Sequence, residues 1–453
     1  MLAQNGNIYG TTNWNQSNIY GITTGGTETL LWQSAQGAGD QCEWQPGTYY
    51  PPFNGMTLGA DGLLYGACWM WEGNGNSSGV IYKYDPSQGQ NGITVVYSFP
   101  VGEQTLPNVL TLGTDGNLYG TTFGTGSSSL GTVFQFKPTT NKLTTLHNFQ
   151  GVEFSDGANP TGPLTLGSNG SFYGTTYGGG VNGGSSSGTV YSITTKGKIK
   201  ILYSFNTFTN PTSGTNPNAG VAQGNDGNFY GITFSGGTAG QGTIFKVTPA
   251  GKLTSLHNFN ESADNAGYPV WPLTLGSDGN FYGSAQDCNA GGCSAESLFE
   301  IATKAKKGTY TYTNLYNFTN PSSCTGYTPT GCIPSSALLQ HPNGNFYGVT
   351  ADGGGSYPGY ATGVFYSLST GLKPFVSLQF PRGTEGSSLG IFGQGFQTGP
   401  ATAVSFNGTV ASFTVVSDTY MTATIPTGAT KGYVTVAEPA GTLQSKIKFT
   451  PIK

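Results

Sequence analysis

Asp115-Gly116-Asn117-Leu118-Tyr119-Gly120 decides the fold, because this stretch returns at regular intervals along the chain. Close copies occur at Asn5–Gly10, Asp61–Gly66, Asn169–Gly174, Asp226–Gly231, Asp278–Gly283 and Asn343–Gly348. Their tyrosines are 52 to 65 residues apart, which defines seven repeats. A period of this length is typical of proteins that stack one supersecondary unit many times.

Each repeat is expected to form four short strands. In the fourth repeat the pattern predicts strands at 164–167, 172–176, 188–193 and 199–205, with Asn169-Gly170 as a type I′ turn between the first two. Seven such repeats predict an all-β fold, a seven-bladed β-propeller of four-stranded antiparallel blades. A β-solenoid is the alternative, although it would need shorter coils and parallel pairing.

The pattern stops near residue 372, and the remaining segment has a different organisation. Short alternating strands are expected around Gly390–Phe396, Val404–Gly408, Val415–Pro426 and Gly432–Ala437. Such a run of about 80 residues fits an immunoglobulin-like β-sandwich, although it lacks the Cys and Trp of an antibody domain. We therefore expect a propeller over residues 1–372 and an Ig-like domain over 373–453.

Both parts resemble known families. The Asp/Asn-Gly-Asn-Phe-Tyr-Gly and Gly-Thr-Val-Phe elements resemble the GloVer tandem repeat of secreted bacterial proteins. The C-terminal segment resembles an IPT/TIG domain, through Gly390–Phe396, Val404–Gly408 and Val415–Pro426. The resemblance implies the architecture and a secreted location, but no activity, and it implies that the C-terminal domain is an interaction or spacer module. No C-terminal anchor motif is visible, unlike in the family.

Charged residues are scarce, at 8% of the chain, and the net charge is −4. Seventeen cations cannot neutralise a run of phosphates, so nucleic acid is excluded as a partner. No apolar stretch is long enough to span a membrane. Aromatic residues make up 13% of the chain, so a packed core is expected despite the high glycine content.

Six cysteines in polar loops predict disulfides and an extracellular or cell-surface location, because such bonds persist in oxidising compartments. We expect the pairs Cys42–Cys68, Cys288–Cys293 and Cys324–Cys332, one of the 15 connectivities that six cysteines allow. A zinc site is disfavoured because paired CxxC and nearby His ligands are missing. No signal peptide is visible, so we expect that a secretion signal is removed or omitted.

The loops predict where ligands bind. We define the loop face as the connections between second and third strands and between successive repeats, where nearly all the length variation lies. These loops carry acids and most of the tryptophans, whereas lysines lie at the opposite turns. Variable loops on a rigid scaffold often bind ligands, although long loops can also bury their own aromatics. The candidate ligand-binding residues are Trp14, Trp44, Trp69, Trp71, Tyr268 and Trp271.

No catalytic residue, metal site or cofactor is expected. His147 and His257 stand where other repeats have Tyr97, Tyr203 or Tyr316, which indicates a structural role, and His341 lies in a turn opposite the loop face. The Asp-Gly-Asn segments lack the spaced ligands of a calcium loop. Carboxylate pairs such as Glu153 with Asp156, or Glu43 with Glu72, leave a carboxylate-dependent glycan-active enzyme as an alternative.

We therefore expect a non-catalytic extracellular surface protein that recognises a glycan or a surface protein. The alternative from another class is a structural subunit of an extracellular filament, sheath or surface layer, in which copies of the chain form a homopolymer. A surface with few charges repels a neighbouring copy weakly, which favours such association.

Overall fold

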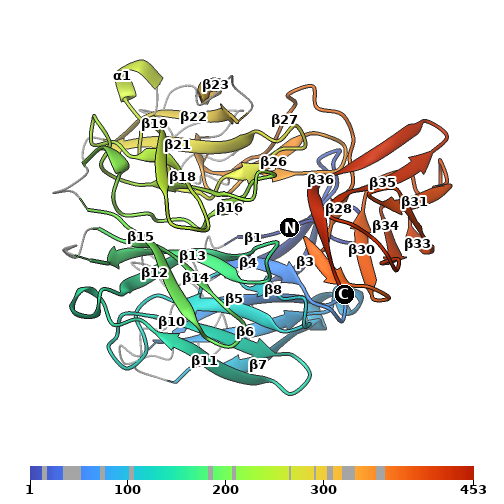
Figure 1. Ribbon diagram of the computed structural model, residues 1–453, viewed down its shortest axis with the longest axis horizontal. Helices are drawn as coiled ribbons and strands as arrows, with labels where there is room; N and C mark the ends of the chain where they lie inside the picture. Colours follow the sequence, from blue (N-terminus) through green and yellow to red (C-terminus); the bar gives the residue numbers. More distant parts are fainter. Residues whose placement is uncertain are drawn as a thin grey trace. The chain divides into compact units, whose positions relative to one another are not determined.

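The structure, a computed structural model, describes residues 1–12, 18–33, 53–71, 77–100, 107–181, 187–206, 211–264, 267–289, 292–303, 310–318, 332–352 and 363–453 (Figure 1). In these residues strands dominate, and the helices are short: η1 (Pro86–Asn91), η2 (Val152–Phe154), η3 (Pro211–Ser213) and α1 (Glu261–Asp264). The chain divides into two compact units. The first contains Met1–Ala3, Asn7–Leu166 and Gly170–Phe205, and the second contains Gln4–Gly6, Gly167–Asn169 and Asn206–Lys453.

In the first compact unit each repeat forms its own antiparallel sheet. The first sheet has three strands in the described chain, and the next three sheets have four strands each, in sequence order. These strands are β1 (Ile8–Thr12), β2 (Asn18–Ile22), β3 (Glu28–Gln33); β4 (Phe53–Leu58), β5 (Leu64–Trp71), β6 (Ser77–Tyr84), β7 (Ile93–Ser98); β8 (Thr111–Leu112), β9 (Leu118–Thr122), β10 (Thr132–Lys137), β11 (Lys142–Asn148); and β12 (Gly157–Leu166), β13 (Phe172–Gly179), β14 (Thr189–Ile193), β15 (Ile199–Ser204).

In the second compact unit the remaining repeats form three further four-stranded sheets, and in the last of them β24 and β25 both pair with β26. These strands are β16 (Ala222–Gln223), β17 (Phe229–Thr233), β18 (Thr243–Val247), β19 (Leu253–Asn258); β20 (Thr274–Leu275), β21 (Phe281–Asn289), β22 (Gly292–Ala302), β23 (Thr311–Phe318); and β24 (Cys332–Pro334), β25 (Leu339–Gln340), β26 (Phe346–Asp352), β27 (Phe365–Leu368). The prediction of an all-β chain with repeated four-stranded antiparallel sheets is confirmed.

The turn inside the repeated motif differs from the prediction. Gly116 N donates to Gly113 O at 3.0 Å, and Gly113 N donates to Asn117 O at 2.8 Å. In the described chain the positive φ falls on Gly116 (77°) and not on Asp115. A type I′ turn needs positive φ at two successive residues, so that prediction is wrong. The connection is a three-residue loop, in which a type I turn is followed by a left-handed glycine.

The aspartate of the motif ties this turn together. Asp115 Oδ1 accepts from Asn117 N at 3.2 Å, and Asp115 Oδ2 accepts from the Tyr119 hydroxyl at 2.7 Å. Burial, together with this carboxylate, raises the pKa of Tyr119 well above its ordinary value, so the hydroxyl stays a donor. The same bond joins Tyr65 to Asp61, Tyr230 to Asp226 and Tyr282 to Asp278.

The last glycine of the motif makes room for an aromatic ring of the next strand. Gly120 on β9 is in register with Phe134 on β10, and a Cβ placed on Gly120 would lie 2.5 Å from Cζ of Phe134. The ring of Tyr191 likewise covers Gly174 in the fourth repeat. The Tyr-Gly and Gly-Thr-Val-Phe elements are therefore two halves of one packing contact, which explains why they recur together.

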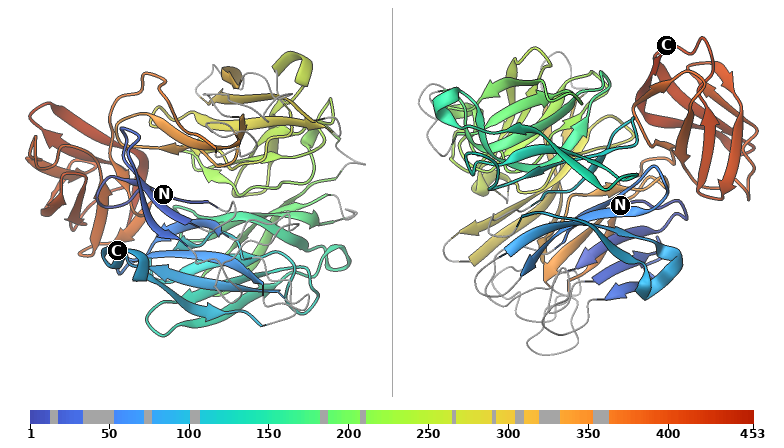
Figure 2. Two further views of the ribbon diagram at one scale, coloured as in Figure 1. Left: turned by 180° about the vertical axis from the view of Figure 1, so that it is seen from behind. Right: turned by 90° about the horizontal axis from the view of Figure 1, so that it is seen from below.

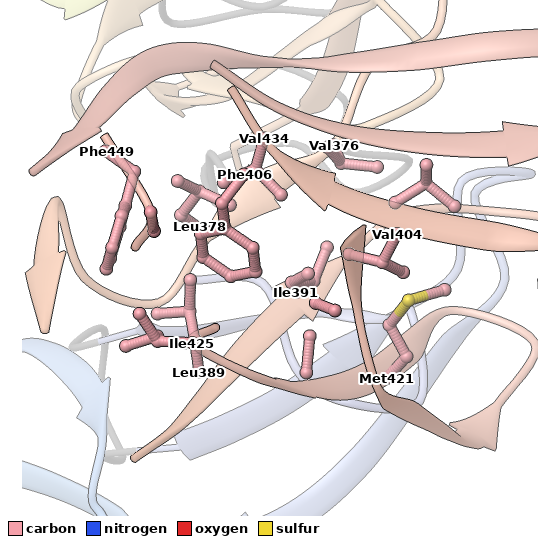
Figure 3. Packing of buried hydrophobic residues seen from close by; sticks show 14 of the residues in the cluster. Val376, Leu378, Leu389, Ile391, Val404, Phe406, Met421, Ile425, Val434 and Phe449 are labelled. Atoms are coloured by element: carbon pink, nitrogen blue, oxygen red, sulfur yellow. The ribbon is translucent and has the colours of Figure 1, made fainter. Parts of the chain in front are cut away.

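The C-terminal segment forms two further sheets. One has the order β28 (Ser377–Leu378), β30 (Ser388–Phe392), β34 (Tyr420–Thr424), β33 (Phe413–Ser417), and the other has the order β29 (Arg382–Thr384), β36 (Gly441–Ile452), β35 (Gly432–Glu438), β31 (Ala403–Phe406), β32 (Thr409–Ala411). The sheets lie face to face (Figure 2), and Figure 3 shows the apolar core between them, which includes Ile391, Phe406 and Met421.

This C-terminal segment is anchored within the second compact unit. Ile447 packs against its own core and also against the core that β17 to β22 share. Asn225 Nδ2 donates to Lys446 O at 2.9 Å. The hydroxyls of Ser417 and Thr419 both donate to Gln4 O, at 2.9 and 2.8 Å. Apolar and polar contacts together fix the segment to the repeats.

Candidate functional site

Two of the six predicted ligand-binding residues have described side chains. Trp14 and Trp44 lie outside the described residues, and Trp69 and Trp71 belong to β5 with side chains outside the described part. Tyr268 and Trp271 lie on the loop face, in the connection between β19 and β20. The structure therefore locates one part of the predicted aromatic surface.

Tyr268 and Trp271 are half-buried, and each contacts another segment of the second compact unit. The Tyr268 ring lies 5.3 Å from the Phe234 ring, and Tyr268 N donates to Gln241 O at 2.8 Å. Trp271 Nε1 donates to Pro334 O at 2.8 Å. Because the indole N–H of Trp271 already has a partner, this side chain can offer a ligand only the exposed part of its ring.

His147 and His257 occupy the predicted slot on the fourth strands. Each ring packs edge-on against the phenylalanine two residues later, at 4.9 Å and 5.0 Å, and Tyr97, Tyr203 and Tyr316 make the same contact. Each histidine also meets a loop carboxylate: His147 Nε2 lies 2.9 Å from Asp156 Oδ2, and His257 Nε2 lies 2.8 Å from Asp264 Oδ2. These histidines clamp the loop that follows their strand.

The carboxylates that pair with the two histidines are buried. Asp156 is 7% exposed and Asp264 is 9% exposed. Asp156 also accepts from the backbone N–H groups of Gln150 and Gly157, at 3.0 and 2.8 Å, while Glu153 is exposed. These hydrogen bonds indicate that Asp156 stabilises the loop. They give no support to the alternative in which Glu153 and Asp156 are a pair of catalytic carboxylates. Glu43 and Glu72 lie outside the described residues.

His341 lies, as predicted, in the turn between the first two strands of the last repeat, and it is 1% exposed. Asn343 N donates to His341 Nδ1 at 3.1 Å, and His341 Nε2 lies 3.3 Å from Gly6 O. Burial lowers the pKa of His341, because a protonated ring would have to carry its charge away from water and without a carboxylate partner. The neutral ring donates through Nε2.

The pair of His257 and Asp264 borders a hollow of about 640 Å³ in the second compact unit. Its walls are α1 and the outer strand β23. The lining residues are Ala263, Asp264, Tyr312, Asn314, Leu315, Tyr316 and Asn317. This volume lies in the range of small-ligand sites, which is roughly 300–1,000 Å³. The hollow is the candidate functional site.

Hydrogen bonds and ring stacking hold the walls in place. The ring of His257 stacks on Tyr312 at 4.1 Å with an interplanar angle of 6°. Asn314 Nδ2 donates to Asp264 O at 3.0 Å and to Asn317 Oδ1 at 2.7 Å. α1 begins after Asn260, whose side chain accepts from Ser262 N at 3.1 Å. The site is therefore preorganised, which lowers the entropic cost of binding.

The polar side chains of the lining are mostly uncharged. Burial raises the pKa of Tyr312 well above its ordinary value, so its hydroxyl stays protonated. Asp264 Oδ2 is held by His257 and by Asn260 N at 2.9 Å. The remaining polar side chains of the lining include the uncharged amides of Asn314 and Asn317. Such groups donate and accept hydrogen bonds without changing charge.

Sequence reasoning placed acids in the loops of the loop face but missed the hollow. The available signal was the pairing of a histidine in the Tyr slot with an aspartate in the next loop, seven residues later for His257 and nine for His147. Tyr312 and Asn314 give no such signal, because they lie on a strand whose pattern resembles its neighbours. Their role depends on a wall contributed by another repeat.

One cysteine side chain can be described. Cys68 is completely buried on β5 and is in the disulfide-bonded form. The side chains of Cys42, Cys288, Cys293, Cys324 and Cys332 lie outside the described part of the structure. Cys288 on β21 and Cys293 on β22 are directly opposite each other in the ladder. A disulfide can span the distance between the Cα atoms of such a pair. The three pairings stay predictions.

The sequence matches the model of the Gloeobacter/Verrucomicrobia repeat over residues 1–211 and 181–390. The chain belongs to this repeat family. The match includes every copy of the motif, so the repeat resemblance is confirmed. No curated protein matches the sequence.

The solved structures that match this chain are only distantly similar to it. A fungal alcohol oxidase of the AA5 family has 14% identity and a TM-score of 0.46, with 99% of this chain and 96% of that chain covered. TolB from Acinetobacter baumannii has 14% identity and a TM-score of 0.39, with 67% and 64% covered. A luciferin-regenerating enzyme has 15% identity and a TM-score of 0.41, with 72% and 94% covered. These likenesses carry no activity over to this chain.

Within the described residues, no helix has the length and apolar character needed to cross a membrane. The same part of the chain contains no group of three or more His, Cys, Asp or Glu side chains arranged to hold a metal ion.

Proposed function

We propose that the protein is a non-catalytic extracellular surface protein that recognises a glycan or a surface protein through the loop face of its repeats. The observation that carries this proposal is the hollow beside α1, which lies between a loop-face connection and a strand edge. Its lining includes the amides of Asn314 and Asn317, Asp264 and Tyr312, which are groups that can fix a ligand's orientation. Membership of a repeat family supports a scaffold that presents loops.

The proposed architecture is a seven-bladed β-propeller over residues 1–372, followed by an IPT/TIG-like immunoglobulin-fold domain over residues 373–453. The sheet formed by each repeat supports the propeller, and the two facing sheets of the C-terminal segment support the Ig-like domain. The disulfide-bonded form of Cys68 supports secretion, because disulfides are rare in reducing compartments.

Retention of the labelled full chain on an array of glycans and extracellular proteins tests this function. We expect saturable binding, no change in the bound molecules, and weaker binding after Trp69→Ala or Trp271→Ala. Trp271→Phe is the matched control, since it keeps a ring at the same position. An array without any bound partner, or conversion of a bound glycan into product, would contradict the proposal.

A second candidate function is assembly into an extracellular filament, sheath or surface layer. Val410 on β32 and Val416 on β33 are 71% and 54% exposed, and these strands are the outer strands of the two C-terminal sheets. Open strand edges with apolar side chains are templates for pairing with another chain. Light scattering across a concentration series separates the two functions, because a monomer at high concentration contradicts assembly.

A further inference from the structure

The turns between third and fourth strands carry lysines that recognition by the loop face does not use. In the third and fourth repeats, five exposed lysines lie at or beside these turns: Lys137, Lys142, Lys196, Lys198 and Lys200. In the described part of these repeats, Asp115 is the only acid outside the loop after β11, which holds Glu153 and Asp156. The salt bridges of the described chain involve none of these lysines. The positive charge of the two turns is therefore largely uncompensated.

Two of these lysines lie directly opposite each other. Lys137 on β10 and Lys142 on β11 are the last pair of the ladder before the turn. Directly opposite side chains share one face of a sheet, and like charges in such a pair are destabilising. The turn between them, residues 138–141, is uncharged and does not offset this repulsion. An anion bound between the two ammonium groups would relieve it.

The face that carries this pair is turned toward the fourth repeat. Gln135 comes two residues before Lys137, so both side chains lie on the same side of β10. Gln135 is in register with Tyr119, whose ring lies 4.2 Å from the Phe172 ring of the fourth repeat. Lys137 and Lys142 are therefore on the side of the third sheet that faces the fourth.

The turn of the fourth repeat approaches the outer strand of the third. A Cβ placed on Gly197 would lie 2.6 Å from Leu146 O on β11. Lys196 directly precedes this glycine in the turn, and Lys142 lies four residues before Leu146, which is roughly 13 Å along an extended strand. We call Lys137, Lys142 and Lys196 the turn cluster, because they border one surface between two neighbouring turns.

The chemistry of the turn cluster selects among anions. The single arginine of the chain is Arg382, so the cluster lacks the planar fork that binds phosphate groups bidentately. In residues 137–142 and 194–200 no large apolar side chain is exposed, so the cluster lacks an anchor for a membrane. Thr144 is exposed on the same face as Lys142, and its hydroxyl can hydrogen-bond to a sugar hydroxyl. Carboxylates spaced along a hydroxylated chain match this surface.

We propose that the turn cluster binds an anionic polysaccharide of the polyuronate class, with one carboxylate between Lys137 and Lys142 and another at Lys196. A polyuronate carries one charge per sugar, which is a far lower charge density than that of a nucleic acid duplex, so a few lysines suffice. This surface is separate from the loop face. The inference therefore goes beyond the proposed function and does not depend on it.

Fluorescence anisotropy and calorimetry on the full chain test the cluster, with a labelled oligogalacturonate as the probe. Its methyl ester is the matched neutral probe, and a single-stranded oligonucleotide and phosphatidylglycerol vesicles are the competing anions. We expect the oligogalacturonate to bind, the ester not to bind, and binding to weaken as the salt concentration rises. Lys142→Glu should weaken binding roughly tenfold or more. A thermal melt should show no loss of stability, because this change places opposite charges across the ladder.

Lys200→Glu is the matched control, because it makes the same change of charge on another face. Lys200 is in register with Ser192, whereas Ile201 on the same strand packs into the core shared with the third repeat. Its effect on affinity should be small.

Four outcomes would overturn the proposal: no oligogalacturonate binding, equal binding of the ester, equal loss in Lys200→Glu, or preference for the oligonucleotide or the vesicles. An unchanged affinity of Lys142→Glu would likewise overturn it and would mean that the lysines only protect the strand edges. Lys142→Glu should leave the retention of array partners by the loop face unchanged. The two proposals can therefore fail separately.

Discussion

The glycine that ends each motif is the residue on which the packing of a repeat depends most directly. We predict that Gly120→Ala destabilises the protein by about 1–3 kcal/mol, because the new methyl group would overlap the Phe134 ring, which is completely buried. Gly10→Ala is the matched control: it has the same place in the first repeat, but an added Cβ there meets nothing within 4 Å. Thermal melts compare the two, and equal losses would contradict the packing explanation.

At the scale of the hairpin, the motif works through its aspartate–tyrosine bond. We predict that Asp115→Ala lowers the free energy of unfolding by about 1 kcal/mol, because Tyr119 and the turn backbone lose an acceptor. Asp115→Asn should cost much less, since the last repeat has Asn343 at this position and its Nδ2 donates to the Tyr347 hydroxyl at 2.9 Å. Urea denaturation measures the difference, and equal destabilisation by both substitutions would refute this role of the bond.

Strands and their order follow from the sequence because their causes are local. The predicted strands of the fourth repeat match β12 to β15 within a few residues, except that β12 begins at Gly157 instead of 164, where pairing with β13 extends it. The Asn-Gly and Asp-Gly dipeptides indicated a turn but not its type, because the carboxylate bond to Asn117 N and the tyrosine bond favour the longer loop.

The candidate site was predictable only in part, because it combines elements from different repeats. The loop face and its acidic character follow from loop length and charge. The stack of His257 on Tyr312 and the bond from Asn314 to Asp264 O join residues about 50 positions apart, and a pattern within one repeat does not contain them. Contacts of this kind depend on tertiary packing, which determines which loop meets which strand edge.

For the whole molecule, the attachment of the C-terminal segment gives a pH-dependent prediction. Lys446 Nζ lies 3.4 Å from Leu275 O and 5.7 Å from the centre of the Phe375 ring, and no carboxylate of the described chain pairs with it. Burial lowers the pKa of Lys446 to about 8 from its ordinary value of 10.5. A charged amine at this junction therefore opposes the attachment.

The sign of the effect follows from proton binding. Between pH 8 and 10.5 the unfolded chain holds the Lys446 proton while the folded chain releases it, so the free energy of unfolding rises with pH in that window. We predict that Lys446→Met stabilises the protein by about 1 kcal/mol at pH 7 and that this gain disappears by about pH 10. Denaturation midpoints measured from pH 7 to 10.5 check this. Lys448→Met, at an exposed position on the same strand, should show no such trend, and a constant or negative difference for Lys446→Met would mean that the amine is solvated at the junction.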